Sequence, residues 1–178
     1  MTDQPDVVVG ADRVVLPGVG AFAACMSGLR ERPGLLLALE EAVRKRGAPF
    51  LGVCVGMQLM ADRGLEFGET AGLGWIAGEV RPLQPSDPAL RVPHMGWNTV
   101  EPQRPHPLFA GAEDQAMYFA NSFSFHAAEP ERVLAVSDHG GAFTAAVAKD
   151  NMAGVQFHPE KSQDAGIGLL ARFLGWTP

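Results

Sequence analysis

A cysteine placed between two glycines is the feature of this sequence with the clearest chemical potential. An apolar run ends in Cys54, Gly52 and Gly56 stand at its second-neighbour positions, and a helix-compatible run begins at Gln58. This spacing is typical of a nucleophile elbow, a strained turn between a strand and a helix. A Cβ atom at either glycine would collide with the adjoining strand or helix, and the nearby helix N-terminus favours a thiolate. We predict that Cys54 is a nucleophile; the alternative is a buried cysteine on a core strand.

A base and an acid that could serve this thiol stand together near the C-terminus. His158 and Glu160 lie two residues apart, so on an extended backbone their side chains project to the same side. The imidazole could take the Cys54 proton on one nitrogen while Glu160 accepts a hydrogen bond from the other. Pro159 stiffens the chain between them. The alternative is that His158 caps the end of a strand and Glu160 is a solvated loop acid.

Acyl transfer also requires N–H donors for the developing oxyanion. The backbone N–H of Val55, directly after the cysteine, is the expected first donor. The second is expected from Gly18 and Val19, because glycine lets a backbone amide approach a reacting carbonyl closely. An ordinary turn between a strand and a helix is the alternative for this loop.

The elements that must position these residues follow from the hydrophobic pattern. We expect buried strands at 13–16, 49–53 and 154–158 and helices at 21–29 and 35–46, with shorter strands between 74 and 155. A last helix, capped by Ser162, is expected to carry four apolar residues inward: Ile167, Leu170, Phe173 and Leu174. Early alternation of strands and helices followed by extra strands predicts one α/β domain with a central, mostly parallel sheet.

Composition narrows the class of protein. The chain has 178 residues, enough for one domain, and a formal charge of −6, which argues against a nucleic-acid or anionic-membrane surface. Two cysteines make no disulfide framework, and the N-terminus has no basic signal-peptide region, so we expect a cytoplasmic protein. We expect no metal and no cofactor, because four histidines lack paired ligand spacing: His94, His106, His126 and His139.

Three motifs together resemble one enzyme family. The segments 17–20, 52–58 and 158–162 are similar to those of the triad-type (class I) glutamine amidotransferases. The segment Pro93 to Asn98, with Lys161 and Ser162 after the acid, most resembles the glutaminase subunits of imidazole glycerol phosphate synthase, from histidine biosynthesis. The resemblance covers essentially the whole chain and implies a three-layer, flavodoxin-like α/β fold.

The resemblance implies a reaction. Cys54 would attack the side-chain amide of glutamine, His158 would protonate the departing ammonia, and water would hydrolyse the thioester. Gln58 would contact the bound glutamine, and Asn121, Ser122 and Phe123 would line its α-amino and carboxylate end. The family usually has His and Tyr where this chain has Asn121 and Phe123, and an ordinary alternating strand over 119–125 is the alternative.

The resemblance also implies a partner. Free ammonia becomes ammonium in neutral water and is no longer a nucleophile, so such a glutaminase works docked on a synthase. The family's partner is a (β/α)8-barrel cyclase, which forms a heterodimer with the glutaminase. We expect four residues at the docking face: Met95, Trp97, Asn98 and Lys161. Trp97 is the expected anchor; a Trp97 packed in the core is the alternative.

Family members normally open with a βα unit ahead of the segment that resembles residues 2–12. On this resemblance the chain is N-terminally short, and we expect the 178 residues alone to be poorly stable and largely inactive. The unit holds a central strand of the sheet, and its loss would leave two neighbouring strands with unpaired backbone groups. A cooperative thermal melt, with glutaminase turnover beside the cyclase, would contradict this expectation.

Three other functions remain open from the sequence. A class I glutaminase of a chorismate or pyridoxal phosphate pathway would share the triad but lack the segment 93–98 in this form. A cysteine peptidase or deglycase often has its base directly after the cysteine, where this chain has Val55. A short chain that only binds the cyclase, without catalysis, is the third.

Overall fold

Three parallel strands form the part of the sheet that holds the predicted nucleophile. The computed structural model describes residues 2–112 and 115–178. In it β2 (Phe50–Cys54) lies between β1 (Val14–Gly18) and β11 (Met152–Val155), parallel to both. All five residues of β2 are buried, as expected for a parallel strand covered on both faces. The predicted strands at 13–16 and 49–53 are confirmed within one or two residues.

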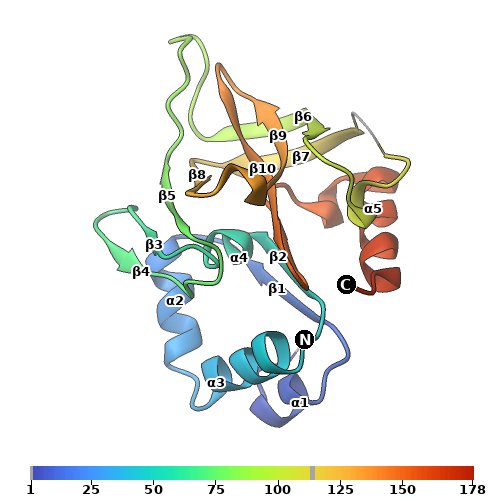
Figure 1. Cartoon of the computed structure of the whole chain (residues 1–178). Coiled ribbons are helices and arrows are strands. Elements are labelled where there is room, and N and C mark those ends of the chain that lie inside the picture. Colours follow the sequence, from blue (N-terminus) through green and yellow to red (C-terminus); the bar gives the residue numbers. More distant parts are fainter. Residues whose placement is uncertain (1, 113–114) are drawn as a thin grey trace.

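The other strands pair mostly antiparallel. The order β1-β2-β11-β10-β8-β5-β3-β4 runs through the sheet, and a branch leaves it at β10, which pairs with β9; β9 pairs with β6, and β6 pairs with β7 (Figure 1). The bounds of these strands are β3 (Arg63–Gly64), β4 (Thr70–Ala71), β5 (Gly78–Pro82), β6 (His94–Pro102), β7 (Gln115–Asn121), β8 (Phe123–Ala127), β9 (Val133–Asp138) and β10 (Ala142–Lys149). The short strands predicted between 74 and 155 are therefore present.

Helices lie on both sides of the parallel strands. Figure 1 shows α1 (Pro5–Val9), α2 (Phe22–Arg30) and α3 (Leu35–Leu39) together on one side, and α5 (Gln163–Gly175) on the other. The predicted helix at 35–46 is confirmed, although its second half, Glu40–Lys45, is wound as a π-helix. Short 3-10 turns complete the set at Pro107–Phe109, Pro130–Arg132 and Pro159–Lys161.

The inward face of the last helix differs from the prediction. Its buried residues are Gly166, Leu169 and Phe173, whereas the predicted Ile167 and Leu174 are 64% and 65% exposed. The reason is a close contact, because a Cβ at Gly166 would lie 1.9 Å from the carbonyl oxygen of Pro159. Glycine at this position lets the helix backbone pack directly on the preceding turn, which rotates the apolar stripe.

Ser162 precedes α5 but its side chain does not cap the helix. Its hydroxyl instead donates to the carbonyl oxygen of His158 at 2.6 Å and accepts the N–H of Tyr118 at 2.9 Å. The capping role predicted for Ser162 is therefore wrong. The residue fixes the segment that carries His158 against β7.

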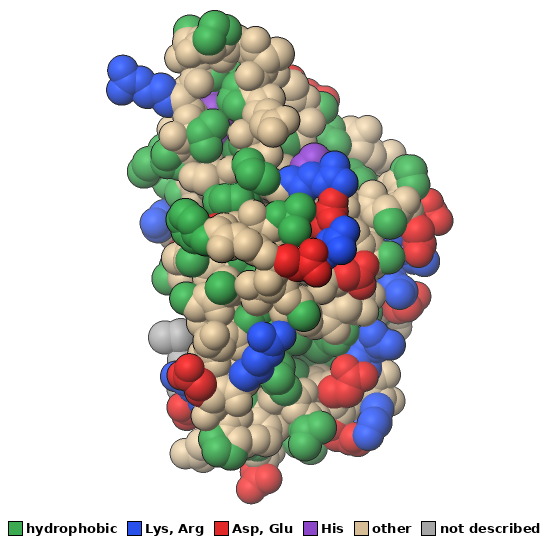
Figure 2. Space-filling model, turned by 90° about the vertical axis from the view of Figure 1, so that its left-hand side faces the viewer, with side chains coloured by type: hydrophobic (Ala, Val, Ile, Leu, Met, Phe, Trp, Pro, Cys, Tyr) green, Lys and Arg blue, Asp and Glu red, His purple; other side chains and the backbone are tan. Residues whose placement is uncertain are grey.

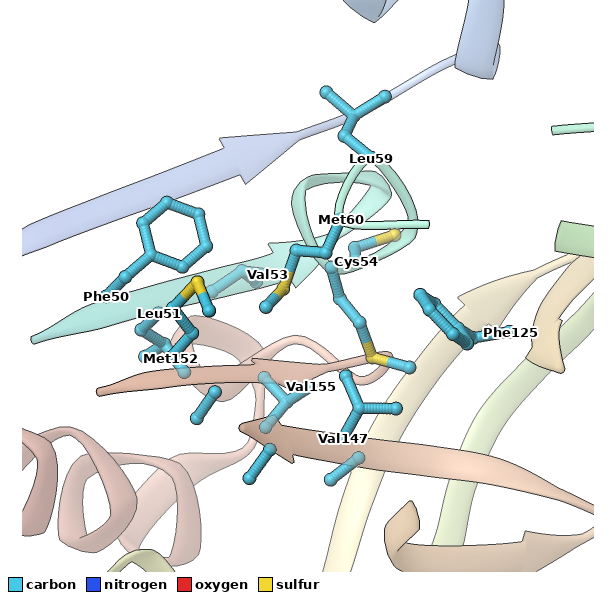
Figure 3. Packing of buried hydrophobic residues seen from close by; sticks show 14 of the residues in the cluster. Phe50, Leu51, Val53, Cys54, Leu59, Met60, Phe125, Val147, Met152 and Val155 are labelled. Carbon is cyan, nitrogen blue, oxygen red and sulfur yellow. The ribbon is translucent and has the colours of Figure 1, made fainter. Parts of the chain in front are cut away.

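The core surrounds the parallel strands. Figure 3 shows Phe50, Leu51 and Val53 of β2 packed with Met152 and Val155 of β11, and all five are buried. The strand ends at Cys54, where the chain turns into the one-turn helix α4 (Val55–Gln58). Packing on both sides therefore fixes the backbone that leads into Cys54.

The open edge of the sheet lies on β1. Within the described residues, no strand pairs with β1 on the side away from β2, and Val15 is 46% exposed there. A hollow of about 300 Å³ lies beside this edge, lined by Val15, Pro17, Val53 and Leu170. An unpaired strand edge and an apolar hollow both weaken a fold. The poor stability expected of the 178 residues remains a prediction.

Charges on the surface are mixed in sign. Figure 2 shows acidic and basic side chains interspersed over one face, without a continuous patch of either sign. One mixed group consists of Arg63, Glu69, Glu79 and Arg81, which form ion pairs with one another. No helix among the described residues is long and apolar enough to cross a membrane.

A buried histidine at the start of β6 predicts loss of stability in acid. The ring of His94 is 6% exposed and stacks on His139 with ring centroids 4.2 Å apart. Burial, and secondarily His139, lower the His94 pKa from 6.5 to about 4. The unfolded chain therefore takes up the proton first. The stability from the neutral ring is complete above pH 6.5 and is lost as the pH falls toward 4.

We expect His94→Phe to remove part of this pH dependence. Protonation of His94 should lower the free energy of unfolding of the wild-type protein by about 2 kcal/mol between pH 7 and pH 5. The variant has no imidazole at this position and should not show this part of the decrease. Urea unfolding at both pH values, followed by tryptophan fluorescence, measures the difference. Equal pH dependence in the two proteins would contradict the assignment.

Candidate active site

The turn at Cys54 has the geometry of a nucleophile elbow. Cys54 has φ 54° and ψ −115°, a strained conformation for a residue with a side chain. A Cβ at Gly52 would lie 2.6 Å from the carbonyl oxygen of Gly56, and a Cβ at Gly56 would lie 1.8 Å from that of Leu16. The predicted collisions with the helix and with the adjoining strand are both confirmed. Glycine is required here because backbone packs directly on backbone.

The glycine loop after β1 contacts the elbow. A Cβ at Gly18 would lie 2.7 Å from the backbone nitrogen of Gly56 and 2.9 Å from the Cβ of Val55. Gly20 has φ +91°, which favours glycine. The structure therefore brings the three predicted oxyanion donors, Gly18, Val19 and Val55, to one place.

The predicted base and acid are paired. His158 Nδ1 lies 2.7 Å from Glu160 Oε1; the imidazole is almost fully buried and the carboxylate is half exposed. The backbone route to this pair differs from the prediction: β11 ends at Val155, and Glu160 lies in a 3-10 turn. The N–H of His158 donates to the carbonyl of Tyr118 at 2.8 Å, which anchors the base to β7.

The thiol is held as the neutral form when no ligand is present. Burial raises the pKa of Cys54 from 9.0 to about 11, and the charge of Glu160 adds to this. The N–H of Val55 and the amide of Gln156 donate to the sulfur and oppose the rise in pKa. At neutral pH, formation of the thiolate therefore requires a base to take the proton.

A cavity of about 310 Å³ opens over the sulfur. It brings together residues from the glycine loop, the elbow, the β7–β8 connection and the segment after β11: Val19, Gly20, Cys54, Val55, Gln58, Glu66, Ala120, Asn121, Ser122, Phe123, His158 and Lys161. Cys54 and His158 line this one cavity. This shared lining favours the roles of nucleophile and base, which stay predictions, over those of a core thiol and a strand-capping histidine.

The polar lining of the cavity is rich in acceptors. Asn121 is 5% exposed; its Nδ2 donates to the carbonyl of Phe123 at 3.0 Å, and its Oδ1 has no partner. Gln58 Nε2 also donates to the Phe123 carbonyl, at 3.3 Å. A buried acceptor without a partner costs free energy unless a ligand supplies a donor. The lining therefore suits a ligand with an ammonium or amide group.

The segment 119–125 is interrupted. β7 ends at Asn121, β8 begins at Phe123, and Ser122 lies between them. The alternative of one alternating strand is therefore wrong. Ser122 and Phe123, at this break, both line the cavity.

Sequence reasoning missed Glu66, which lines the same cavity. It lies in the connection between β3 and β4, and its Oε2 accepts the N–H of Phe22 at 2.7 Å, at the start of α2. An acid in a short hairpin carries no local signal of this role. Its position depends on the packing of the hairpin against α2.

Three of the four predicted docking residues lie on the surface. Met95 and Trp97 are 64% and 48% exposed on the same face of β6, and Lys161 is exposed, 5.8 Å from the ring centre of Tyr118. The alternative of a core-packed Trp97 is wrong. Asn98 projects to the opposite face of β6, where its Nδ2 donates to the carbonyl of Asp138. Asn98 therefore makes a contact within the chain, and its docking role stays a prediction.

Comparison with known sequences decides the family. The family model for class-I glutamine amidotransferases matches residues 4–174. The chain belongs to the class-I glutamine amidotransferase family. This amidotransferase chain is 60% identical over 179 residues to the "imidazole glycerol phosphate synthase subunit HisH" of Caulobacter vibrioides and 53% identical over 182 residues to that of Agrobacterium fabrum. Each match covers all of this chain and 84% of the relative.

Solved structures agree on the fold. A crystal structure of a glutamine amidotransferase superimposes with a TM-score of 0.71 at 18% identity, over 97% of this chain and 84% of that one. The glutaminase domain of Trypanosoma brucei CTPS, with bound acivicin, gives a TM-score of 0.60 at 17% identity, over 98% and 75%. The predicted α/β amidotransferase fold is confirmed.

Proposed function

We propose that this amidotransferase chain is the glutaminase subunit of an imidazole glycerol phosphate synthase, in the cytoplasm. It would form a single amidotransferase domain over residues 1–178. The observation that carries the proposal is the shared cavity of the strained Cys54 and the His158–Glu160 pair, in a chain 60% identical to the Caulobacter subunit. A chorismate or pyridoxal phosphate branch is less well supported, since relatives at 52–60% identity over this whole chain carry the synthase name.

The reaction would be hydrolysis of L-glutamine through a thioester. His158 takes the thiol proton, and the Cys54 sulfur bonds to the side-chain amide carbon. The resulting oxyanion accepts hydrogen bonds from backbone N–H groups of Val55 and of the Gly18–Val19 loop. The carbon–nitrogen bond then breaks as His158 returns the proton to the leaving nitrogen, which releases ammonia. Water, deprotonated by His158, attacks the thioester; the carbon–sulfur bond breaks, and glutamate and the thiol are formed.

The other end of the cavity would hold the α-amino acid group. Glu66 offers a carboxylate, and Asn121 Oδ1 is an acceptor without a partner. Both suit the α-ammonium group of glutamine. Gln58 and the backbone of Ser122 and Phe123 would complete this subsite.

Ammonia would pass to a (β/α)8-barrel cyclase partner in a heterodimer. The cyclase would use it on a phosphorylated ribulosyl-formimino-carboxamide ribonucleotide. The relatives are named as subunits of a synthase, which supports the existence of a partner. The exposed pair Met95 and Trp97, with Lys161 beside the cavity, is the proposed docking face.

The test of this function is a comparison of nitrogen sources. The full-length protein is mixed with its cyclase, and imidazole glycerol phosphate is measured with glutamine or with ammonium salt. We expect synthesis from glutamine only when both subunits are present, and synthesis from ammonium with the cyclase alone. A complex that uses ammonium but never glutamine would show a subunit that binds without catalysis.

We expect Trp97→Ala to weaken docking. Loss of an exposed aromatic anchor typically raises the dissociation constant of an interface by about 30-fold or more. Isothermal titration against the cyclase measures this. Leu37→Ala is the matched control, because Leu37 is 77% exposed on α3, away from β6, and should leave the affinity unchanged. Equal affinities for the two variants would contradict the assigned face.

A further inference from the structure

Gln156 is a buried amide directly behind the proposed nucleophile. It follows β11, whose Val155 pairs with Val53 of β2 (both labelled in Figure 3), so the next residue along the chain lies beside Cys54. Its side chain is 0% exposed, and its backbone N–H donates to the carbonyl of Ala145 at 2.8 Å. Its Nε2 lies 3.7 Å from Cys54 Sγ, within hydrogen-bond range for sulfur.

A second amide fixes this one. Gln58 Nε2 lies 3.0 Å from Gln156 Oε1 and 3.3 Å from the carbonyl oxygen of Phe123. Gln58 is 4% exposed and Cys54 is 5% exposed, so the whole chain of contacts is shielded from water. Hydrogen bonds between amides are stronger when they are buried. Two donors or two acceptors that faced each other there would raise the free energy of the folded state.

The donor and acceptor roles in this series of hydrogen bonds are set by a backbone carbonyl. The Phe123 carbonyl can only accept, so the end of the Gln58 amide that faces it must be the NH2 group. The same nitrogen faces Gln156, whose facing atom must therefore be its oxygen. The nitrogen of Gln156 is then left to face the sulfur, and the oxygen of Gln58 is left as an acceptor.

We propose that Gln156 is a catalytic donor: its amide N–H, oriented by Gln58 and the Phe123 carbonyl, donates to the Cys54 sulfur, stabilises the thiolate and leaves the thiol proton directed to His158. This inference rests on the proposed function of Cys54. A donor to the sulfur also stabilises the thiolate when it leaves the thioester. The Gln156 amide stays neutral throughout, so it does not compete with His158 for the proton of the thiol.

The ionisable groups around the sulfur are His158, Glu160 and Cys25, and Glu66 and Lys161 line the cavity. Glu160 and Cys25 disfavour the thiolate, whereas the Gln156 amide favours it. Since burial dominates, the amide acts against the largest unfavourable contribution. Its removal should therefore be visible in the ionisation of Cys54.

The test is the pH dependence of Cys54 alkylation by iodoacetamide, in a Cys25→Ser background of the full-length protein. Gln156→Met keeps the length of the side chain and loses the donor. Gln156→Glu keeps an acceptor for Gln58 and replaces the NH2 group with an oxygen that also repels the thiolate when ionised, so Gln156→Met is the decisive variant. We expect both variants to alkylate about threefold more slowly at a fixed pH near 8, with a midpoint shifted upward by about half a unit. Turnover with the cyclase should fall more in kcat than KM rises.

The proposal would be overturned if variants with the melting curve of the Cys25→Ser parent also kept its pH profile of alkylation and its kcat. Alkylation needs no glutaminase reaction, so this result is separable from failure of the proposed function. If both variants fail to fold, nitrogen-15 NMR of the unsubstituted protein decides. One Gln156 side-chain N–H should shift with the Cys54 titration and remain fixed in Cys54→Ala. An N–H that does not follow the titration would overturn the proposal.

Discussion

Cys54→Ala should abolish glutamine-dependent synthesis and leave ammonium-dependent synthesis intact. The thiol supplies the bond to the amide carbon, and Cys54 is the one cysteine among the described residues that line the cavity with His158. We expect a fall of about 10⁴-fold or more in glutaminase turnover. Ammonia release measured in the complex with the cyclase reports this change, and imidazole glycerol phosphate formation from ammonium salt reports that the complex is intact.

Cys25→Ala is the matched control for this prediction. Cys25 is the other cysteine, half-buried on α2, and its thiol donates only to the carbonyl of Val19 at 3.3 Å. We expect its turnover to stay within about tenfold of wild type, since a thiol is a weak donor. If Cys54→Ala retained glutaminase activity comparable to Cys25→Ala, the assignment of the nucleophile would be wrong.

Gly56→Ala should disrupt the elbow. The added Cβ would lie 1.8 Å from the carbonyl oxygen of Leu16, which is part of β1 and in register with Gly52 of β2. Neither backbone can move away without breaking the parallel pair. We expect a loss of about 3 kcal/mol or more in the free energy of unfolding, with loss of glutaminase activity. Urea denaturation of the variant and the wild type measures the change.

Gly28→Ala tests whether crowding is the cause. Gly28 lies inside α2, and a Cβ there meets only the Arg32 guanidinium at 3.7 Å, an ordinary contact. Alanine favours a helix, so this variant should be as stable as wild type or more stable by about 0.5–1 kcal/mol. Similar destabilisation of both variants would point to a general effect of replacing glycine.

Local patterns in the sequence predicted those parts of the site that are built from residues close together in the sequence. Gly52 and Gly56 reported the crowded turn at Cys54 because close backbone packing leaves glycine as the only choice. The pair His158 and Glu160 was found from spacing, although the pairing arises across a 3-10 turn rather than along a strand. The buried strands were found because covered parallel strands are continuously apolar.

Contacts between distant segments were not predictable in this way. Glu66 reaches the cavity only after the β3–β4 hairpin packs on α2, and Gln156 reaches the Cys54 sulfur only after β11 pairs with β2. The buried face of α5 differs from the predicted face because Gly166 packs directly on the backbone of Pro159. A pattern of hydrophobic residues does not reveal such a contact. Asn98 lies on the other face of β6 from Trp97, because successive residues of a strand alternate between its two faces.

The central claim is that Cys54 carries the glutamyl group during the reaction. The most direct measurement is acid quenching of the full-length protein, mixed with its cyclase and glutamine, followed by peptide mass spectrometry. We predict a γ-glutamyl thioester on the peptide that contains Cys54; it should be absent without glutamine and absent in Cys54→Ala. Glutamine turnover with no adduct on that peptide, and with the adduct found on another residue, would contradict the account.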